Sequence, residues 1–266
     1  MRIPIFQLDA FTSRVFAGNP AAVCPLPRWL DDATMLAIAA ENALSETAFV
    51  VSGPQGWSIR WFTPAIEVEL CGHATLAAGH VVLSRLEPHA DEVRFQSPSG
   101  VLGVRRHGDL LALDFPSRPP EPCAVSPALL RALRGVAPQD CLASRDVVAV
   151  LRSEDEVVAL EPDLAAVREL DALGLIVTAP GKSCDFVSRY FAPRAGIDED
   201  PVTGSAHSTL TPLWASRLRK TALEARQVSR RGGELHVELR GDRVMIAGSV
   251  APYLEGHIDV PDGAGA

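Results

Sequence analysis

The pattern of apolar and polar positions predicts two halves with a similar order of elements. The strands expected in the first half are Ile3–Phe11, Ala48–Val51, Trp57–Phe62, Glu92–Gln96, Gly100–Arg106 and Leu110–Asp114. A helix is expected over Asp31–Asn42, with Asp31 as its N-cap. The segment from His73 is rich in Ala and Leu and apolar on most sides, which is typical of a helix enclosed by its own domain.

A proline-rich stretch, Ser117–Pro122, separates the two halves and is the best linker candidate. We therefore expect an N-terminal lobe over residues 1–118 and a C-terminal lobe over residues 119–266, although terminal strands could cross to the other lobe. The elements expected in the second half are a helix over Pro127–Arg134, strands at Val147–Leu151, Leu175–Thr178 and Asp185–Phe191, a helix over Ser205–Arg219 and three closing strands.

The two halves share a local pattern that suggests an internal repeat. W-F-T-P and Y-F-A-P each end a strand, and C-G-H-A and T-G-S-A each open the long helix that follows. Gly72 and Gly204 lie at these helix starts, where free N–H groups and the helix dipole favour a carboxylate or an oxyanion. Two such starts, one from each lobe, would face each other across a cleft. The alternative is that both are ordinary glycine-containing turns.

The composition is that of a globular chain and excludes several classes of partner. The 266 residues are 47% hydrophobic and carry a formal net charge of −8, so no nucleic-acid partner is expected, because such binding depends on clustered Lys and Arg. No apolar run approaches the length of a membrane span, and the N-terminal sequence lacks the apolar run of a secretory signal. We expect a cytoplasmic protein without a membrane partner.

The cysteines and short motifs give no sign of a metal or cofactor. Five cysteines are scattered without a C-x-x-C pair, which favours reduced thiols over a disulfide framework or a zinc site. No H-E-x-x-H, P-loop or G-x-G-x-x-G stretch is present. The expected chemistry therefore uses no metal and no cofactor.

Six stretches in order give the chain a specific resemblance to a known family. They are Q-L-D-A-F-T, F-A-G-N-P-A-A-V, L-S-E-T-A-F-V, C-G-H-A-T-L-A-A-G, D-E-D-P-V-T-G-S-A-H and R-R-G-G-E-L. Together they resemble the phenazine-biosynthesis isomerase-like (PhzF-like) proteins, which have the diaminopimelate-epimerase fold. The resemblance implies an α/β fold of two similar lobes, each an antiparallel sheet curled into a barrel around a central helix, with the active site between the lobes. We also expect a homodimer.

The resemblance also implies a set of site residues. Glu46, in the S-E-T stretch, matches the family's acid/base, and His73, Asp200 and Ser205 match the rest of its polar set. The substrate would be a small carboxylate-bearing molecule. The residues expected to contact it are Asn19, Gly72, His73, Gly204 and Ser205.

Each of these residues also has an ordinary structural explanation. Glu46 could be a solvated carboxylate at the start of a strand, and His73 could be satisfied by backbone at a helix start. Asp200 could cap or turn the chain before the second helix. Asn19, in G-N-P, is a turn residue first and a substrate contact only by the resemblance, and the glycines of Arg231-Gly232-Gly233 are also turn residues.

The leading hypothesis is a cofactor-independent isomerase that moves a proton between carbons of its substrate. Two-base racemases and epimerases of this fold use two cysteines, but here Thr203 stands at the position matching the second one. Cys71 is therefore expected to be a small buried residue. A two-base racemase and a catalytically inactive binding protein of the same fold remain the alternatives.

Overall fold

The computed structural model describes residues 1–261, which divide into two compact units. The first unit contains Met1–Asp114 and residues 247–261, and the second contains Phe115–Ile246. The helices are α1 (Asp32–Asn42), α2 (Gly72–Val81), the π-helical segment η1 (Val82–Leu86), α3 (Pro127–Ala132), α4 (Glu154–Ala159), α5 (Leu164–Arg168), the 3-10 turn η2 (Pro193–Ala195) and α6 (Gly204–Leu218). None of the helices described is both long and apolar enough to cross a membrane.

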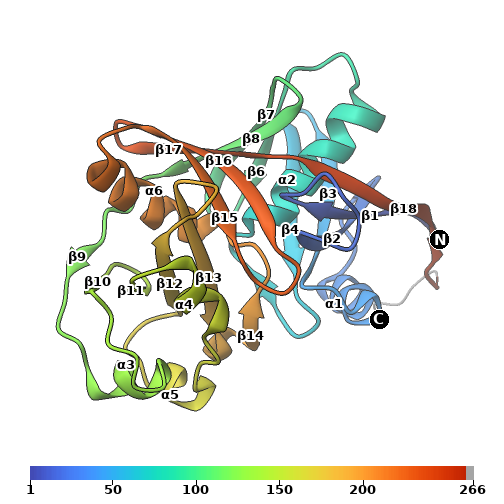
Figure 1. Ribbon diagram of the computed structural model, residues 1–266. Helices are drawn as coiled ribbons and strands as arrows, with labels where there is room; N and C mark the ends of the chain where they lie inside the picture. The colour runs from blue at the N-terminus through green and yellow to red at the C-terminus, as the bar shows by residue number, and fades with distance from the viewer. Residues whose placement is uncertain (262–266) are drawn as a thin grey trace. The chain divides into compact units, whose positions relative to one another are not determined.

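The strands are distributed over both units, as Figure 1 shows. In chain order, the first are β1 (Arg2–Ala10), β2 (Asn19–Leu26), β3 (Glu46–Gly53), β4 (Gly56–Phe62), β5 (Glu67–Val68), β6 (Glu92–Ser97), β7 (Gly100–His107) and β8 (Leu110–Pro116), which crosses the boundary after Asp114. The strands that follow are β9 (Glu121–Pro122), β10 (Asp140–Ala143), β11 (Val147–Val150), β12 (Leu175–Pro180), β13 (Phe186–Ala192), β14 (Ile197–Asp200), β15 (Ala222–Gln227), β16 (Gly233–Arg240), β17 (Arg243–Gly248) and β18 (Val250–Asp259).

In the first unit the strands form a mixed sheet around α2. The order is β18-β1-β2-β3-β4-β6-β7-β8, in which β2–β3 and β4–β6 are parallel and the other neighbours antiparallel. Helix α2 packs against β1, β2, β3, β7 and β18. Its residue Gly79 lies so close to β7 that an added Cβ would come within 2.4 Å of Val104 Cγ1. The absence of a side chain at Gly79 therefore allows the helix to lie directly on the sheet.

The second unit repeats the same order of pairings. Strands β10–β11 are antiparallel, β11–β12 parallel, β12–β13 antiparallel, β13–β15 parallel and β15–β16 antiparallel. The short strand β14 pairs with β13 just before α6, as β5 pairs with β4 just before α2. The internal repeat predicted from the two strand-to-helix stretches is therefore confirmed at the level of topology.

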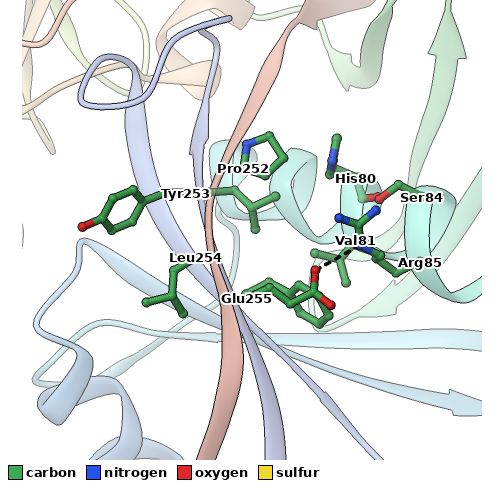
Figure 2. Close-up of a pocket in the computed structure, with 10 residues that line it drawn as sticks. His80, Val81, Ser84, Arg85, Pro252, Tyr253, Leu254 and Glu255 are labelled. Atoms are coloured by element: carbon green, nitrogen blue, oxygen red, sulfur yellow. Dashed lines mark hydrogen bonds and ion pairs between the residues drawn. The ribbon is translucent and has the colours of Figure 1, made fainter.

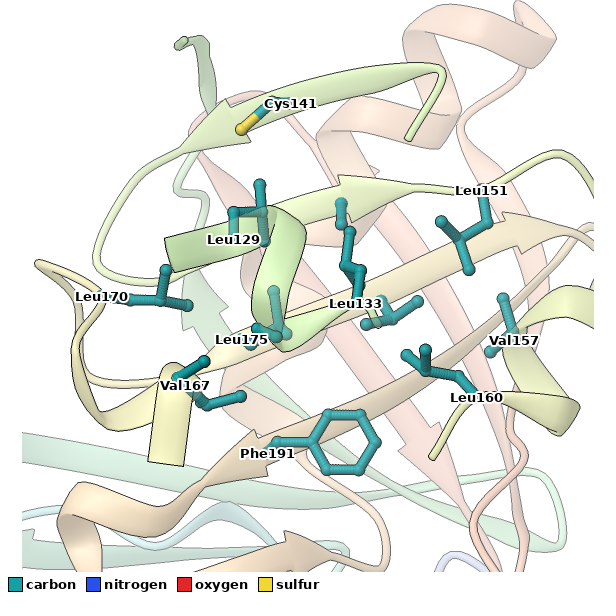
Figure 3. Packing of buried hydrophobic residues seen from close by; sticks show 14 of the residues in the cluster. Leu129, Leu133, Cys141, Leu151, Val157, Leu160, Val167, Leu170, Leu175 and Phe191 are labelled. Carbon is teal, nitrogen blue, oxygen red and sulfur yellow. The ribbon is translucent and has the colours of Figure 1, made fainter. Parts of the chain in front are cut away.

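Helices lie on both faces of the second sheet. Successive side chains of a strand point to opposite faces, and β13 presents apolar side chains on each. Phe191 of β13 packs with residues of α3, α4 and α5 in one apolar cluster (Figure 3). On the other face, the Trp214 ring of α6 stacks on Phe186 at a centroid distance of 5.6 Å, and its Nε1 donates to Thr178 Oγ1 at 3.0 Å. Helix α6 is thus anchored against β12 and β13 by packing and by a buried hydrogen bond.

The sequence predicted most of these elements, with some errors. The α/β class, both long helices and the Asp31 N-cap are confirmed. The sheets are mixed rather than wholly antiparallel, and four strands follow α6 instead of three. Strand β2 was missed because its two prolines lack the N–H that a central strand normally uses. Strand β9 lies inside the predicted linker.

Candidate active site

Three candidate residues of the first unit come together at the start of α2. Glu46 is the first residue of β3, Asn19 is the first residue of β2, and His73 is the second residue of α2. The parallel pairing of β2 with β3 aligns Ala21 with Glu46, which brings the beginnings of both strands to the same end of the sheet. Glu46 is 7% exposed, His73 4% and Asn19 0%. The polar side chains therefore meet out of contact with bulk water.

The imidazole of His73 is the centre of this group. Its Nε2 lies 3.1 Å from Glu46 Oε2, although neither atom has a well-aligned hydrogen-bond partner among the described residues. Its Nδ1 lies 3.1 Å from Asn19 Nδ2 and 3.5 Å from Cys71 Sγ. Ser45 Oγ donates to Asn19 Oδ1 at 3.3 Å. Both ring nitrogens thus lie close to polar side chains.

Burial and charge have opposite effects on this group. Burial lowers the pKa of His73, whereas negative charge on Cys71 and, to a smaller extent, on Glu46 raises it; with both partners charged, the pKa lies well above its ordinary value. Burial also raises the pKa of the Cys71 thiol to about 11, so the thiol is neutral at physiological pH. Near neutral pH, the Glu46 carboxylate is therefore the one of these two groups that still raises the pKa of His73 against the effect of burial.

Glu46, Cys71 and His73 are also the residue types that bind metal ions. One donor atom from each can be chosen so that all three lie within 4.8 Å of one another. However, Cys71 approaches Nδ1 of the imidazole and Glu46 approaches Nε2, at opposite ends of the ring. The shortest contacts of the group are therefore made to two different ring nitrogens.

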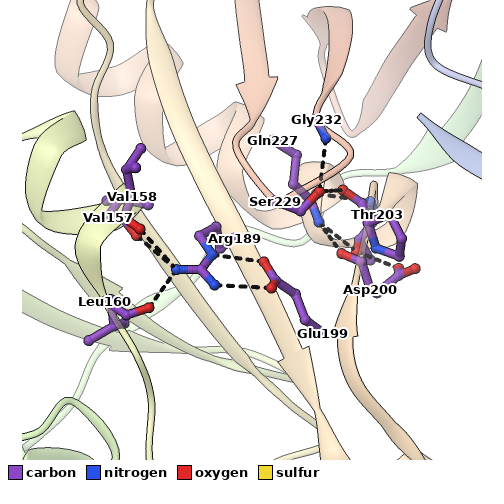
Figure 4. Close-up of polar contacts among 11 residues, drawn as sticks. Val157, Val158, Leu160, Arg189, Glu199, Asp200, Thr203, Gln227, Ser229 and Gly232 are labelled. Carbon is purple, nitrogen blue, oxygen red and sulfur yellow. Dashed lines mark hydrogen bonds and ion pairs between the residues drawn. The ribbon is translucent and has the colours of Figure 1, made fainter. Parts of the chain in front are cut away.

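The start of α6 in the second unit is fixed by a buried network. Thr203 Oγ1 donates to Asp200 Oδ2, and the Thr203 N–H donates to Gln227 Oε1 at 2.9 Å. Gln227 Nε2 donates to the Asp200 carbonyl at 2.7 Å, and Gln227 itself is fully buried (Figure 4). Asp200 ends β14, so it is not the N-cap of α6; Thr203 occupies that position.

The predicted turn at Arg231-Gly232-Gly233 is confirmed at Gly232, whereas Gly233 begins β16, and the turn supports the same loop. Gly232 has a φ of +68°, which favours glycine, and its N–H donates to Ser229 Oγ at 3.1 Å. The Ser229 hydroxyl donates in turn to the Pro201 carbonyl at 2.8 Å (Figure 4). The turn therefore helps to hold the segment that carries Asp200.

Arg145 is a candidate site residue that the sequence analysis missed. Its Nη2 donates to Ser205 Oγ at 3.0 Å and lies 3.3 Å from Asp146 Oδ2. The buried Asp146 carboxylate accepts a hydrogen bond from the Tyr190 hydroxyl at 3.0 Å. Burial, followed by the charge of Asp146, raises the pKa of that hydroxyl. No sequence motif marked Arg145, since only the turn between β10 and β11 brings it to α6.

The internal repeat relates the two helix starts residue by residue. The first pair of β2–β3 is Ala21 with Glu46, and the first pair of β11–β12 is Val147 with Leu175. In this alignment Asn19 corresponds to Arg145, and Glu46 corresponds to Leu175. The second helix residues, His73 and Ser205, also correspond, so each is contacted by the equivalent residue of its own unit. Only the first unit carries a carboxylate at the Glu46 position.

Some of the structural roles predicted from the sequence are confirmed and one is wrong. Asn19 lies in β2 and is fully buried, so its interpretation as a turn residue is wrong. Cys71 is buried, as expected. Gly72 and Gly204 are the first residues of α2 and α6, and the N-cap residues before them make no capping hydrogen bond through their side chains. The first-turn N–H groups are therefore not satisfied by a capping side chain.

A separate pocket of about 180 Å³ lies in the first unit between β1, β18 and the end of α2 (Figure 2). Arg85 and Glu255 form an ion pair of 3.3 Å at its edge, and Tyr253 and Leu254 are exposed beside it. None of the residues that line it belongs to the group around His73. The pocket is therefore distinct from the candidate active site.

Comparison with known proteins places this arrangement in a family. Residues 8–256 match the family described as phenazine biosynthesis-like protein. An uncharacterized isomerase of Pseudomonas aeruginosa is 51% identical over 96% of this chain and 98% of its own length. The human phenazine biosynthesis-like domain-containing protein is 40% identical over 96% of this chain and 99% of its own length.

Solved structures agree with the sequence matches. A PhzF-family protein of Enterococcus faecalis has a TM-score of 0.95 and 44% identity, covering 98% of this chain and 100% of its own. A hydroxyproline epimerase of Agrobacterium vitis, at 10% identity, shares the fold with a TM-score of 0.63 and covers 97% of this chain and 91% of its own.

The fold and its relatives define an isomerase with an epimerase-like architecture. The chain belongs to the phenazine biosynthesis-like, or PhzF-like, family.

Proposed function

We propose that this isomerase moves a proton between carbons of a small carboxylate-bearing metabolite without a cofactor, with Glu46 as the acid/base in a cleft between the two lobes. The observation that carries the proposal is the contact between the buried Glu46 carboxylate and the His73 imidazole, at 3.1 Å. A buried carboxylate that is not surrounded by water is well placed to take a proton from carbon. As a carboxylic acid, it can return that proton to another carbon.

The two helix starts would hold the substrate. Removing a proton next to a carboxylate creates an enolate, whose negative charge is stabilised by N–H groups at a helix N-terminus. Gly72 and Gly204 begin the two helices without a side-chain cap. At α6, Arg145 donates to the Ser205 oxygen, which leaves the Ser205 proton available for an anionic oxygen of the substrate.

The internal repeat favours a single acid/base over the two-base racemase. Leu175 occupies the position of Glu46 in the second unit, and Thr203 occupies the position of Cys71. Since the pKa of Cys71 is raised by burial to about 11, its thiolate is scarce at neutral pH. The intact polar set counts against an inactive binding protein, because such a protein has no need of a buried Glu–His contact.

The proposal is tested by exchange at carbon in deuterated water. Candidate metabolites with a carboxylate next to an unsaturated carbon are incubated with the enzyme, and NMR detects deuterium at individual carbon positions. We expect exchange and isomerisation of one substrate class with the wild-type enzyme.

Glu46→Gln should abolish both reactions while ligand binding persists, because the amide keeps the shape but cannot accept a proton from carbon. The expected loss in kcat is on the order of a hundredfold to ten-thousandfold. Glu41→Gln, which changes an exposed glutamate of α1, is the matched control and should behave as wild type. Near-normal turnover by Glu46→Gln would contradict the assignment and make Asp200 the next carboxylate to test.

A further inference from the structure

Asn19 contacts both His73 and the residue that precedes Glu46 in the chain. Its Nδ2 is 3.1 Å from His73 Nδ1, and its Oδ1 receives a hydrogen bond of 3.3 Å from Ser45, the residue before Glu46. The side chain is fully buried at the first position of β2. Gly18, which precedes it, has a φ of +63° and lies too close to the Ala10 carbonyl to carry a side chain. The backbone therefore fixes where the Asn19 amide can lie.

The chemistry of the amide group determines which imidazole nitrogen carries the proton. An NH₂ group only donates hydrogen bonds, so a ring nitrogen that faces it must offer a lone pair. With Nδ1 as acceptor, a neutral His73 carries its single proton on Nε2. That nitrogen lies 3.1 Å from Glu46 Oε2.

We propose that Asn19 is a positioning residue that holds His73 in the neutral tautomer protonated on Nε2, so that the ring N–H faces the Glu46 carboxylate. His73 then presents an N–H donor to Glu46 and carries no positive charge. The two side chains act together as one proton-transfer pair. The tautomer follows from contacts within the first unit alone. Its consequence for turnover rests on the function proposed above.

The protonation state of His73 depends on the groups that face its ring. The titratable groups beside the ring are Glu46 from β3 and Cys71 from the segment before α2. Cys71 is a neutral thiol at physiological pH. The larger of the two charges that raise the pKa of His73, that of a Cys71 thiolate, is therefore missing near neutral pH. Burial then disfavours the imidazolium, Glu46 favours it, and the NH₂ group of Asn19 supports the neutral ring. A carboxylate in place of Asn19 would instead accept from Nδ1–H and favour the imidazolium.

The experiment is ¹⁵N NMR of the histidine rings in the whole protein, which needs no substrate. The His73 signals are identified by their loss in His73→Gln. At neutral pH we expect wild-type His73 to show a protonated Nε2 and an unprotonated Nδ1. Asn19→Asp should show both nitrogens protonated, and its His73 titration should move upward by at least one pH unit. Asn42→Asp, which places the same charge at the end of α1, is the control and should leave the His73 tautomer unchanged.

Several results would overturn the proposal. They are a wild-type His73 protonated on Nδ1, a wild-type imidazolium at neutral pH, or an unchanged ring in a folded Asn19→Asp. If Asn19→Asp does not fold, the wild-type spectrum alone decides the tautomer. Once a substrate is known, the pH profile of kcat should shift in Asn19→Asp but not in Asn42→Asp. Failure to find any substrate would weaken the proposed function while leaving the NMR result intact.

A second, independent observation concerns two cysteines of the second unit. Pro122 of β9 pairs with Leu142 of β10, so Cys123 is the next residue opposite Cys141 on the neighbouring strand. The Cys123 N–H donates to the Cys141 carbonyl at 2.9 Å, and the two sulfur atoms are also 2.9 Å apart. Both are free thiols, with Cys123 exposed and Cys141 buried. The pair is therefore aligned for bonding and accessible from one side.

We infer that Cys123 and Cys141 form a reversible disulfide by exchange with an oxidised low-molecular-weight thiol such as glutathione disulfide. The Cys123 thiolate attacks glutathione disulfide, forming a mixed disulfide and releasing one glutathione thiolate. Cys141, after losing its proton, attacks the Cys123 sulfur and releases the second glutathione. Two protein thiols are oxidised and one glutathione disulfide is reduced to two thiols.

Burial, followed by the contact with Cys123, raises the pKa of Cys141 to about 12. Because the thiolate is the nucleophile, the exposed Cys123 reacts first. The test is incubation of the folded protein with glutathione disulfide, followed by non-reducing peptide mapping. We expect a Cys123–Cys141 cross-link that dithiothreitol reverses and that disappears in Cys123→Ser and Cys141→Ser.

Cys184→Ser should retain the cross-link, since Cys184 is a partly exposed thiol outside the pair. A stable glutathione adduct on Cys123, a cross-link through another cysteine, or no reaction would each contradict the inference.

Discussion

At the start of α6, the hydrogen bond from Arg145 sets the direction of the Ser205 hydroxyl. Because a guanidinium only donates, the Ser205 oxygen is the acceptor and its proton points elsewhere. Arg145 is itself held by the buried Asp146. In the first unit, Asn19 corresponds to Arg145 and contacts His73, which corresponds to Ser205. Equivalent positions thus orient the polar side chain at each helix start.

Ser205→Ala and Arg145→Gln should each weaken substrate binding and turnover, because the Ser205 proton is expected to bind the substrate in both the ground and transition states. The expected loss in kcat/KM is about tenfold for each variant, as for a single hydrogen bond to a charged group. The double variant should lose less than the product of the two single losses, since both act through one hydroxyl. Steady-state kinetics of the four proteins measure this; full additivity would mean that Arg145 acts independently of Ser205.

His73→Ala should also lower binding and turnover together, because the imidazole is expected to assist both the substrate and Glu46. The measurement is kcat and KM on the substrate identified by deuterium exchange. His80→Ala, which changes a histidine near the C-terminal end of the same helix, is the control for α2. A variant with altered KM and unchanged kcat would limit His73 to binding.

At the scale of elements, the loop before α6 depends on one buried amide. Gln227 of β15 accepts from the Thr203 N–H and donates to the Asp200 carbonyl, so it joins the end of β14 to the start of α6. A buried backbone group that loses its partner costs about 1–3 kcal/mol. The loop geometry is therefore stabilised from a strand that is distant in sequence.

Gln227→Leu should lower the free energy of unfolding by about 2–4 kcal/mol, because two buried backbone groups lose their partners. Chemical denaturation measures the change. Gln139→Ala, at an exposed glutamine, is the matched control and should change stability little. A loss below that range in Gln227→Leu would show that water or a rearranged loop replaces the amide.

His207 gives α6 a pH-dependent stability. Burial lowers the pKa of its imidazole to about 4, and its Nδ1 donates to the Thr203 carbonyl at 2.8 Å. The unfolded chain therefore binds a proton at a higher pH than the folded chain. The contribution to stability is complete above the unfolded pKa of about 6.5 and is lost as the pH falls toward 4.

Between pH 7 and pH 5, this one group should lower the free energy of unfolding by about 1–2 kcal/mol. His207→Asn keeps a donor for the Thr203 carbonyl but does not titrate, so its stability should fall less over the same range. Urea denaturation at both pH values compares the two proteins. Identical pH dependence would show that His207 is not the responsible group.

At the scale of the whole molecule, each unit contains one of the two helix starts, and the acid/base proposed above, Glu46, lies in the first unit. The proposed cleft therefore predicts that a single ligand perturbs both helix starts. Titration of the identified substrate or product into Glu46→Gln should shift the backbone amide signals of both Gly72 and Gly204 in NMR spectra. The Gly108 signal, from an exposed turn, is the control. Perturbation of one glycine alone would confine the site to one unit.

Local patterns were sufficient to predict several features from the sequence. The helices after Cys71 and Thr203, the Asp31 cap and the Gly232 turn depend on interactions a few residues apart, which periodicity and turn chemistry report directly. The repeat was also visible, because both copies place a glycine at the same strand-to-helix junction. The resemblance to a family supplied Glu46 and the residues expected to accompany it.

Only the tertiary structure revealed which side chains meet. Asn19 and His73 are 54 residues apart, and Arg145 and Ser205 are 60 residues apart, so each pair meets only through the pairing of strands and the packing of a helix on the sheet. Gln227 had no sequence signal, because a buried amide is recognised by its partners and not by its neighbours in the chain. The sequence by itself thus determined the helix starts and their residue types. The strand pairing decided which atoms meet there, since long-range contacts leave no local pattern.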